Sequence, residues 1–177
     1  MRALTMWRKK STHAISSVAI SNGQIYNMSP DVMEVEELRS YTHGQFEDIK
    51  YLMSQLSARC VFTEKQLSAT LNDSNCRMYV IFADGHIIAC ATLCVFHSPT
   101  GTKASVEDVV VASEYRGQQL GRQLIEHVLA EAEKLAPIEL HLTSNPKRVV
   151  ANGLYQSLGF KKKETNSYRM ILPAKDT

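Results

Sequence analysis

The junction between an apolar run at 109–111 and an amphipathic helix beginning near Gly121 constrains the fold more than any other part of the chain. Three consecutive valines predict a strand, and the apolar residues after Gly121 recur at helical spacing. The connecting segment, 115–121, contains Gly117 and Gly121, which allow a tight bend and a close approach of the backbone to a ligand. A strand, a bend and a helix in this order predict an α/β fold in which the free N–H groups of the helix start lie at the bend.

The bend at 115–121 has the properties of an anion-binding site. Unpaired N–H groups and the positive end of the helix dipole attract an anion, and Arg116 and Arg122 add charge beside them. A pyrophosphate of a nucleotide or coenzyme suits such a site, whereas the alternative is a simple turn. Neither a P-loop nor a nicotinamide or flavin site is indicated, because the Lys-Ser or Lys-Thr pair and the G-x-G-x-x-G spacing are missing.

Composition favours one globular domain without a general nucleic-acid role. The 177 residues are 44% hydrophobic and 21% charged, which suffices for a sizeable core. Residues 1–32 carry four basic side chains and one acidic, a net charge of +3, so the rest of the chain is at −1. A nucleic-acid-binding domain needs a basic face on its folded part. We expect a single domain at 33–173, preceded at 1–32 by a disordered or non-native extension.

Two further features concern the cellular setting. The most apolar stretch, 79–96, is about as long as a membrane span, but Asp84-Gly85 interrupts it where a hairpin turn would lie, so no membrane association is expected. The chain has four cysteines, Cys60, Cys76, Cys90 and Cys94. They form no C-x-x-C pair and have no histidine partner at zinc spacing, so we expect structural thiols and no bound metal. Free thiols also predict a reducing, cytoplasmic location.

Apolar periodicity and turn residues predict the order of the elements. The strands are expected at 33–39, 77–83, 86–96, 104–111 and 138–142. The helices are expected at 43–56, 63–71, 117–135 and 146–158. A capping box at 63–66 opens the second helix, and Asn145 is expected to cap the fourth. A final hairpin-like pair of strands is expected at 160–164 and 167–172.

Two sequence blocks carry a family resemblance. Residues 109–121 and 151–160 resemble the coenzyme-A motifs of the GCN5-related N-acetyltransferase (GNAT) superfamily. The resemblance in element order covers 33–172. It implies a mixed, mostly antiparallel central sheet that is splayed between its fourth and fifth strands, with helices on both faces and acetyl-CoA in the resulting cleft.

The same resemblance implies which residues bind acetyl-CoA. They belong to the strand, the bend, the helix start and the second block, and are Val109, Val110, Val111, Arg116, Gly117, Gln118, Gln119, Leu120, Gly121, Arg122 and Asn152. Two positions depart from the family pattern: Gln119 stands where a glycine is usual, and Arg148 stands where an asparagine often precedes Tyr155 by seven residues. Asn152 is expected to supply an equivalent polar contact.

The chemistry of amine acetylation assigns roles to three side chains. An amine that attacks a thioester must be neutral, and the departing thiolate needs a proton. The resemblance implies that Tyr155 supplies that proton, but a phenol of pKa ~10 protonates a thiolate of pKa ~8.5 uphill by about 2 kcal/mol. Tyr155 is thus expected to donate a hydrogen bond, or to have its pKa lowered by Arg148 or other neighbours. Glu107 is favoured as the base, through water, and Asp108 as a substrate-binding group; an equal alternative is that either carboxylate anchors the loop or binds the substrate. Because side chains alternate along a strand, the two are expected to point to opposite faces, so that only one addresses the cleft.

We therefore expect an enzyme that transfers acetyl from acetyl-CoA directly to a primary amine of a small molecule or peptide. One alternative is a non-catalytic acyl-CoA-binding sensor, and another is a structural protein whose glycine-containing bend is only a turn. A homodimer formed through the C-terminal strands is left open. The sequence does not identify the amine.

Overall fold

The structure, a computed structural model, describes residues 18–21, 24–27, 33–57 and 60–172. Its internal contacts divide the chain into two units, Met1–Glu34 and Val35–Thr177. In the first unit, β1 (Val18–Ser21) pairs antiparallel with β2 (Gln24–Asn27). The expectation that 1–32 are a disordered or non-native extension falls mostly outside the described residues and stays a prediction.

The second unit is built on a five-stranded sheet in the order β3-β4-β5-β6-β7. The strands are β3 (Val35–Glu37), β4 (Cys76–Ala83), β5 (His86–Ser98), β6 (Gly101–Val111) and β7 (Glu139–Leu142). The first four pair antiparallel, and β7 pairs parallel with β6. A mixed and mostly antiparallel sheet was predicted, and this prediction is confirmed.

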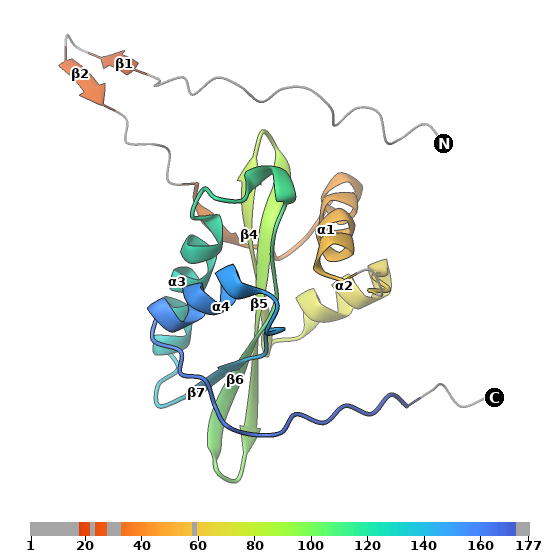
Figure 1. Cartoon of the computed structure of the whole chain (residues 1–177). Helices are drawn as coiled ribbons and strands as arrows, with labels where there is room; N and C mark the ends of the chain where they lie inside the picture. Colours follow the sequence, from red (N-terminus) through yellow and green to blue (C-terminus); the bar gives the residue numbers. More distant parts are fainter. Residues whose placement is uncertain (1–17, 22–23, 28–32, 58–59, 173–177) are drawn as a thin grey trace. The chain divides into compact units, whose positions relative to one another are not determined.

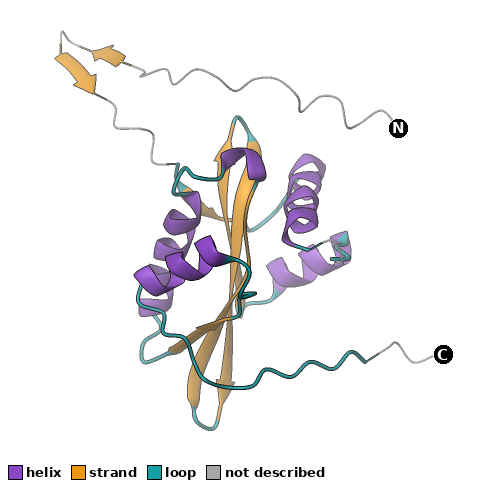
Figure 2. Cartoon of the chain, viewed as in Figure 1, coloured by secondary structure: helices purple, strands orange, loops and turns teal. Residues whose placement is uncertain are grey.

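Helices cover both faces of the sheet, as expected. They are α1 (His43–Leu56), α2 (Glu64–Asn72), α3 (Leu120–Glu133) and α4 (Val149–Ser157), and a 3-10 turn, η1 (Ser113–Tyr115), follows β6. Figure 1 shows α1 and α2 on one side of the sheet and α3 and α4 on the other, with the strands coloured apart from the helices in Figure 2. No helix in the described part of the chain is long and apolar enough to cross a lipid bilayer.

Local sequence signals account for the best-predicted elements. Both α1 and α2 begin with a capping box; in α2 the Thr63 hydroxyl accepts from the Gln66 N–H at 3.3 Å, and Gln66 Oε1 accepts from the Thr63 N–H at 2.8 Å. Asp84 and Gly85 have φ values of 49° and 80°, as a two-residue hairpin turn requires. The predicted α1, α2 and β4–β5 hairpin are therefore confirmed.

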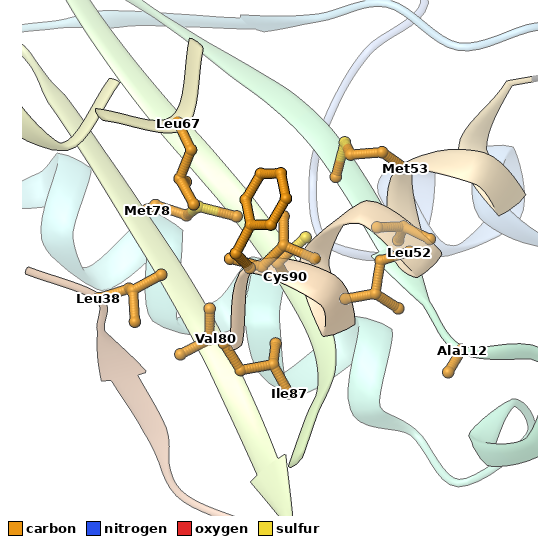
Figure 3. Close-up of a cluster of buried hydrophobic side chains, with 12 residues drawn as sticks. Leu38, Leu52, Met53, Leu67, Met78, Val80, Ile87, Cys90 and Ala112 are labelled. Atoms are coloured by element: carbon orange, nitrogen blue, oxygen red, sulfur yellow. The ribbon is translucent and has the colours of Figure 1, made fainter. Parts of the chain in front are cut away.

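The apolar face of α1 packs on the sheet and forms one side of the core (Figure 3). Ile49 and Leu52 of α1 are fully buried, and Leu67 of α2 is 2% exposed. They meet inward side chains of the two central strands, among them Met78, Val80 and Cys90. Each such side chain contributes about 1.5–3 kcal/mol by leaving water. This packing holds α1 rigidly against β5 and β6, next to the predicted site.

Two predicted helix starts are wrong. The third helix begins at Leu120 and not at 117, because Gly117 and Gln119 have φ values of 82° and 63°, outside the helical region. The fourth begins at Val149 with Arg148 as its N-cap residue. Asn145 instead closes a turn before the helix, where its Oδ1 accepts from the Lys147 N–H at 2.9 Å.

The predicted C-terminal hairpin is also wrong for the described residues, since none of 160–172 lies in a strand. This segment has apolar residues but buries few of them: Tyr168 is 89% exposed and Met170 is 83% exposed. Without a buried face, alternating apolar residues give a strand little stabilisation. The strand expected at 33–39 is present but shorter, because β3 covers only Val35–Glu37.

Candidate active site

A cavity of about 820 Å³ lies where β6, the bend after it and the start of α4 meet. Its wall includes all the predicted coenzyme contacts except Gln118 and Asn152, and it also includes Tyr155. The volume is typical of a site for a sizeable organic ligand. The structure thus brings together two sequence blocks that lie about thirty residues apart in the chain.

The sheet opens beside this cavity because β6 and β7 part. Their pairing runs from Lys103 opposite Glu139 to Val106 opposite Leu142, and β6 then continues to Val111 paired with β5 but not with β7. The Ala112 N–H bonds to Ile88 at 2.8 Å, so the neighbouring N–H of Val111 points away from β5 and towards the opening. An N–H donor without a strand partner is therefore available at the splayed edge.

A β-bulge occurs in the same part of β6. The pairing shifts from Cys90 opposite Val110 to Thr92 opposite Glu107, so β6 has one extra residue here. Asp108 lies in the bulge with a φ of 51°, a left-handed conformation that costs a non-glycine residue about 1–2 kcal/mol. The simple alternation expected for Glu107 and Asp108 is interrupted, because a bulge redirects the side chains.

The two carboxylates have different surroundings. Glu107 accepts a short hydrogen bond from the Ser105 hydroxyl. Protein atoms crowd the Asp108 carboxyl although the residue is partly open to solvent, and this burial, followed by the neighbouring charge of Glu107, raises the pKa of Asp108. A raised pKa makes a carboxylate a better proton acceptor near neutral pH.

Tyr155 lies between two cavities. It lines the cavity next to the bend and also a second one, of about 1040 Å³, along β7, the segment 143–146 and the start of the C-terminal segment. Its ring packs edge-on against Phe160, with 6.0 Å between the ring centroids. Burial raises the pKa of Tyr155, and the charge of Arg148 only partly opposes this shift. The hydroxyl therefore stays protonated, which favours the expected role of hydrogen-bond donor over the alternative of a lowered pKa.

The bend itself exposes backbone donors. Gly117 and Gln119 adopt positive φ, and the first hydrogen bonds of α3 run from the N–H groups of Arg122 and Gln123 to the carbonyl of Gln119. Within 33–57 and 60–172, the N–H groups of 117–121 have no hydrogen-bond acceptor. Consecutive free N–H groups at a helix start form an anion-binding concavity.

The arginines flanking the bend make protein contacts. Arg116 donates from Nε to the Val111 carbonyl at 3.0 Å and from Nη2 to Gln55 Oε1 at 3.1 Å. Arg122 donates to the Ser157 hydroxyl at 2.7 Å, which connects α3 to α4. Both side chains hold the walls of the cavity in place while adding positive charge, and their contact with a coenzyme stays a prediction.

Two residues of α1 that contribute to the site were missed by the sequence analysis. Gln55 and Leu56 at the end of α1 line the cavity, and Arg148 donates to the Leu56 carbonyl at 2.6 Å. Gln55 lies outside both motif blocks, and no local pattern distinguishes it from other polar residues of α1. Asn152 was predicted to contact the coenzyme, but its amide donates to the Asn145 carbonyl at 3.0 Å and lines the second cavity.

Comparison with known proteins adds to this geometry. A family model described as acetyltransferase (GNAT) family matches residues 36–160, which is most of the chain. The [ribosomal protein bS18]-alanine N-acetyltransferase of Escherichia coli (strain K12) is 38% identical over 58 residues, which cover 33% of this chain and 39% of that enzyme. The match thus spans about two fifths of that relative's length.

Solved structures share the fold at low sequence identity. A transcriptional regulator from Bacillus halodurans C-125 has a TM-score of 0.66 at 20% identity, covering 79% of this chain and 99% of that one. For glucosamine-6-phosphate N-acetyltransferase from Arabidopsis thaliana the TM-score is 0.63 at 19% identity, with 79% and 99% covered. AAC(6')-Iy, bound to the bisubstrate analogue CoA-S-monomethyl-acetylneamine, gives 0.61 at 18% identity, with 80% and 100% covered. On the family match and the splayed sheet, this chain belongs to the GNAT acetyltransferase family.

Proposed function

We propose that the protein is an N-acetyltransferase that moves the acetyl group of acetyl-CoA directly to a primary amine. The observation that carries the proposal is the row of free N–H groups at 117–121, which opens into a cavity beside the splayed end of β6. The family uses acetyl-CoA, and these donors fit its diphosphate. Arg116 and Arg122 supply positive charge at the same place.

The reaction needs groups on both sides of the thioester. The amine nitrogen forms a bond to the acetyl carbon, the carbon–sulfur bond breaks, and the sulfur leaves with the electron pair. The N–H of Val111 is positioned to stabilise the oxygen that becomes negative, as a backbone donor at an unpaired strand edge can. Tyr155 donates a hydrogen bond to the departing sulfur, because its raised pKa keeps its hydroxyl protonated. The proton that the sulfur gains comes from the nitrogen that has formed the amide bond, directly or through water.

The excess proton of the amine must go to a base. The sequence favoured Glu107 as this base and Asp108 as a substrate ligand. The surroundings of the two carboxylates support the reverse assignment: Asp108 has the raised pKa and the redirected backbone, and Glu107 is engaged by Ser105. We therefore propose Asp108 as the proton acceptor, directly or through water, with Glu107 helping to hold the cationic form of the amine before it is deprotonated.

The acceptor is proposed to be a primary amine of a small molecule or peptide. Relatives named for such acceptors include the ribosomal-protein alanine N-acetyltransferase and glucosamine-6-phosphate N-acetyltransferase. The second cavity adjoins Tyr155 and is large enough for a sugar or a short peptide. We propose that the amine enters from this cavity and meets the acetyl group next to Tyr155.

A direct assay tests the function. Purified protein is incubated with acetyl-CoA and a panel of amino sugars, polyamines and N-terminal peptides, and the released thiol is measured. Turnover with any amine that depends on Tyr155 supports the proposal. No turnover with retained CoA binding by calorimetry would favour the alternative, an acyl-CoA sensor, which gains interest because one protein of the same fold is described as a transcriptional regulator.

The C-terminal segment supports a proposal about assembly. Its exposed apolar residues, Tyr168, Met170, Ile171 and Leu172, lie close in sequence, and such clusters on a protein surface commonly mark contacts with another chain. We propose that they contribute to a homodimer, which sedimentation of the full chain and of Met170→Lys would test: the variant should be monomeric. On the sequence grounds given above, we also propose a cytoplasmic location.

A further inference from the structure

We infer that Gln55 is a positioning residue for the coenzyme: its side-chain oxygen fixes the segment after β6, so that the free N–H groups of the bend face the cavity. The inference rests on the proposed function, since it concerns the same cavity. Gln55 lies in the last turn of α1, and Oε1 accepts from the Ser113 N–H at 2.9 Å and from Arg116 Nη2 at 3.1 Å.

The orientation of the Gln55 amide is determined by these partners. Both partners are donors, so the amide oxygen must face them. In a flipped amide, the Gln55 NH2 group would face two other donors and could bond to neither. The Nε2 atom is buried on the other side of the amide, and the amide lies near enough to the Tyr51 hydroxyl to oppose the raising of the Tyr51 pKa.

One of the two bonds at Gln55 acts on the bend through Arg116. The same guanidinium that reaches Gln55 also donates from Nε to the Val111 carbonyl at 3.0 Å. Arg116 therefore joins the end of β6 to α1, and Gly117 follows it directly with a φ of 82°. Because the Arg116 side chain is held by two acceptors, the Val111 carbonyl and Gln55 Oε1, the bend is fixed near its start. The N–H groups of 117–121 then keep their position beside the cavity.

The helix that carries Gln55 is rigid for independent reasons. Leu52 and Met53, one turn earlier, are 0% and 4% exposed in the core beneath α1. At the other end of the cavity, the Leu56 carbonyl accepts from Arg148 at 2.6 Å. The end of α1 thus contacts both walls of the cavity, and Gln55 is the contact to the diphosphate side.

The test compares Gln55→Met, which keeps the side-chain length but lacks the acceptor, with Ser54→Ala as control. Ser54 precedes Gln55 on α1, its hydroxyl donates to the Tyr51 carbonyl of the same helix at 2.6 Å, and it does not line the cavity. We expect Gln55→Met to weaken CoA binding and raise the KM for acetyl-CoA by about tenfold, because two hydrogen bonds are lost, while kcat changes little. Ser54→Ala should change neither quantity.

A double-mutant cycle tests the route through Arg116. If Gln55 acts by holding Arg116, the double variant Gln55→Met, Arg116→Met should bind CoA no more weakly than Arg116→Met alone. Additive losses would overturn this route. Wild-type CoA affinity in Gln55→Met, measured by calorimetry in a folded protein, would overturn the inference while leaving the proposed function intact. Absence of CoA binding by the unaltered protein would overturn both.

Discussion

Arg148 donates from Nη2 to the main-chain carbonyl of Leu56 at 2.6 Å, although 92 positions separate the two residues in the chain. This bond connects the start of α4 to the end of α1. The same guanidinium charge lowers the pKa of Tyr155 against the larger effect of burial. The Arg148 side chain therefore affects both the shape of the cavity and the pKa of the Tyr155 hydroxyl.

Replacing Arg148 with Met should have two measurable effects. The loss of an exposed hydrogen bond from a charged donor should reduce the free energy of unfolding by about 1 kcal/mol. The pKa of Tyr155 should rise further, which a spectrophotometric titration of the phenol would detect. Lys147→Met is the matched control, because the Lys147 side chain makes no hydrogen bond or ion pair within the described residues. Equal effects of both substitutions would contradict the assigned role of Arg148.

Replacing Tyr155 with Phe should lower kcat and leave CoA affinity nearly unchanged. The ring keeps its packing against Phe160, and only the hydrogen-bond donor to the departing sulfur is lost, so we expect kcat to fall about 100-fold. Steady-state kinetics combined with calorimetry separate the two quantities. Tyr168→Phe serves as control, because Tyr168 is 89% exposed and lies outside both cavities. A Tyr155→Phe enzyme of normal kcat would show that the Tyr155 hydroxyl does not assist the departure of the sulfur.

The pH dependence of kcat/KM should distinguish Asp108 from Glu107. The folded protein raises the pKa of Asp108, so the base form is lost as the pH falls through this raised value, and kcat/KM should fall with it. Asp108→Asn should remove this acidic limb and lower the plateau about 100-fold, whereas Glu107→Gln should retain the limb. If instead Glu107→Gln removes it, Glu107 is the base, as the sequence suggested.

The raised pKa of Asp108 also has a consequence for the stability of the fold. A carboxyl with a raised folded-state pKa favours folding in its protonated form, so its contribution is present at low pH and is lost as the pH rises through the folded-state pKa. Asp108→Asn should therefore not destabilise the protein at neutral pH through loss of the charge. Urea unfolding at pH 7 and at pH 4 would check this, and a larger loss of stability at pH 7 would contradict it.

Gln118 and Gln119 form a matched pair for testing backbone strain in the bend. Gln119 has a φ of 63°, whereas Gln118 is not among the residues with positive φ. Gln119→Gly should stabilise the fold by about 0.5–1 kcal/mol, since relief of a left-handed side chain outweighs the entropy cost of glycine. Gln118→Gly should destabilise it by about 0.5 kcal/mol. Thermal unfolding of both variants checks the difference in sign, and effects of the same sign would argue against strain.

Thiol reactivity should follow burial. Cys60 is exposed, whereas burial raises the pKa of Cys90 and raises that of Cys94 to about 12. Since the thiolate is the reactive form, Cys60 should react first with an aromatic disulfide reagent in the native protein. Cys90 and Cys94 should react only after unfolding. The fast phase should disappear in Cys60→Ser, and a fast phase that persists would contradict the assignment.

Elements with a local cause could be predicted from the sequence. The capping residue Thr63, the Asp84-Gly85 turn and the apolar face of α1 each act within a few positions, and each is where it was expected. The nine cavity-lining residues of the strand, bend and helix start were found because they are contiguous and resemble a known motif.

What could not be predicted depends on contacts between distant segments. The bulge at Asp108 follows from the register between β5 and β6, which no residue of β6 reveals by itself. Gln55 joins the site only because α1 packs against the end of β6. The C-terminal strands failed for a related reason: alternation at 167–172 predicts a strand, but pairing requires a neighbour that the sequence does not specify.

The helix that follows the bend starts differently from α1 and α2. Those two helices have capping boxes, whereas α3 has Gln119 at its N-cap position and no side-chain cap. A bound diphosphate would act as the missing cap, so the ligand would complete a piece of secondary structure that the polypeptide leaves unfinished. Amide hydrogens in the first turn of α3 should accordingly exchange more slowly when CoA is added, and the melting temperature should rise with CoA concentration.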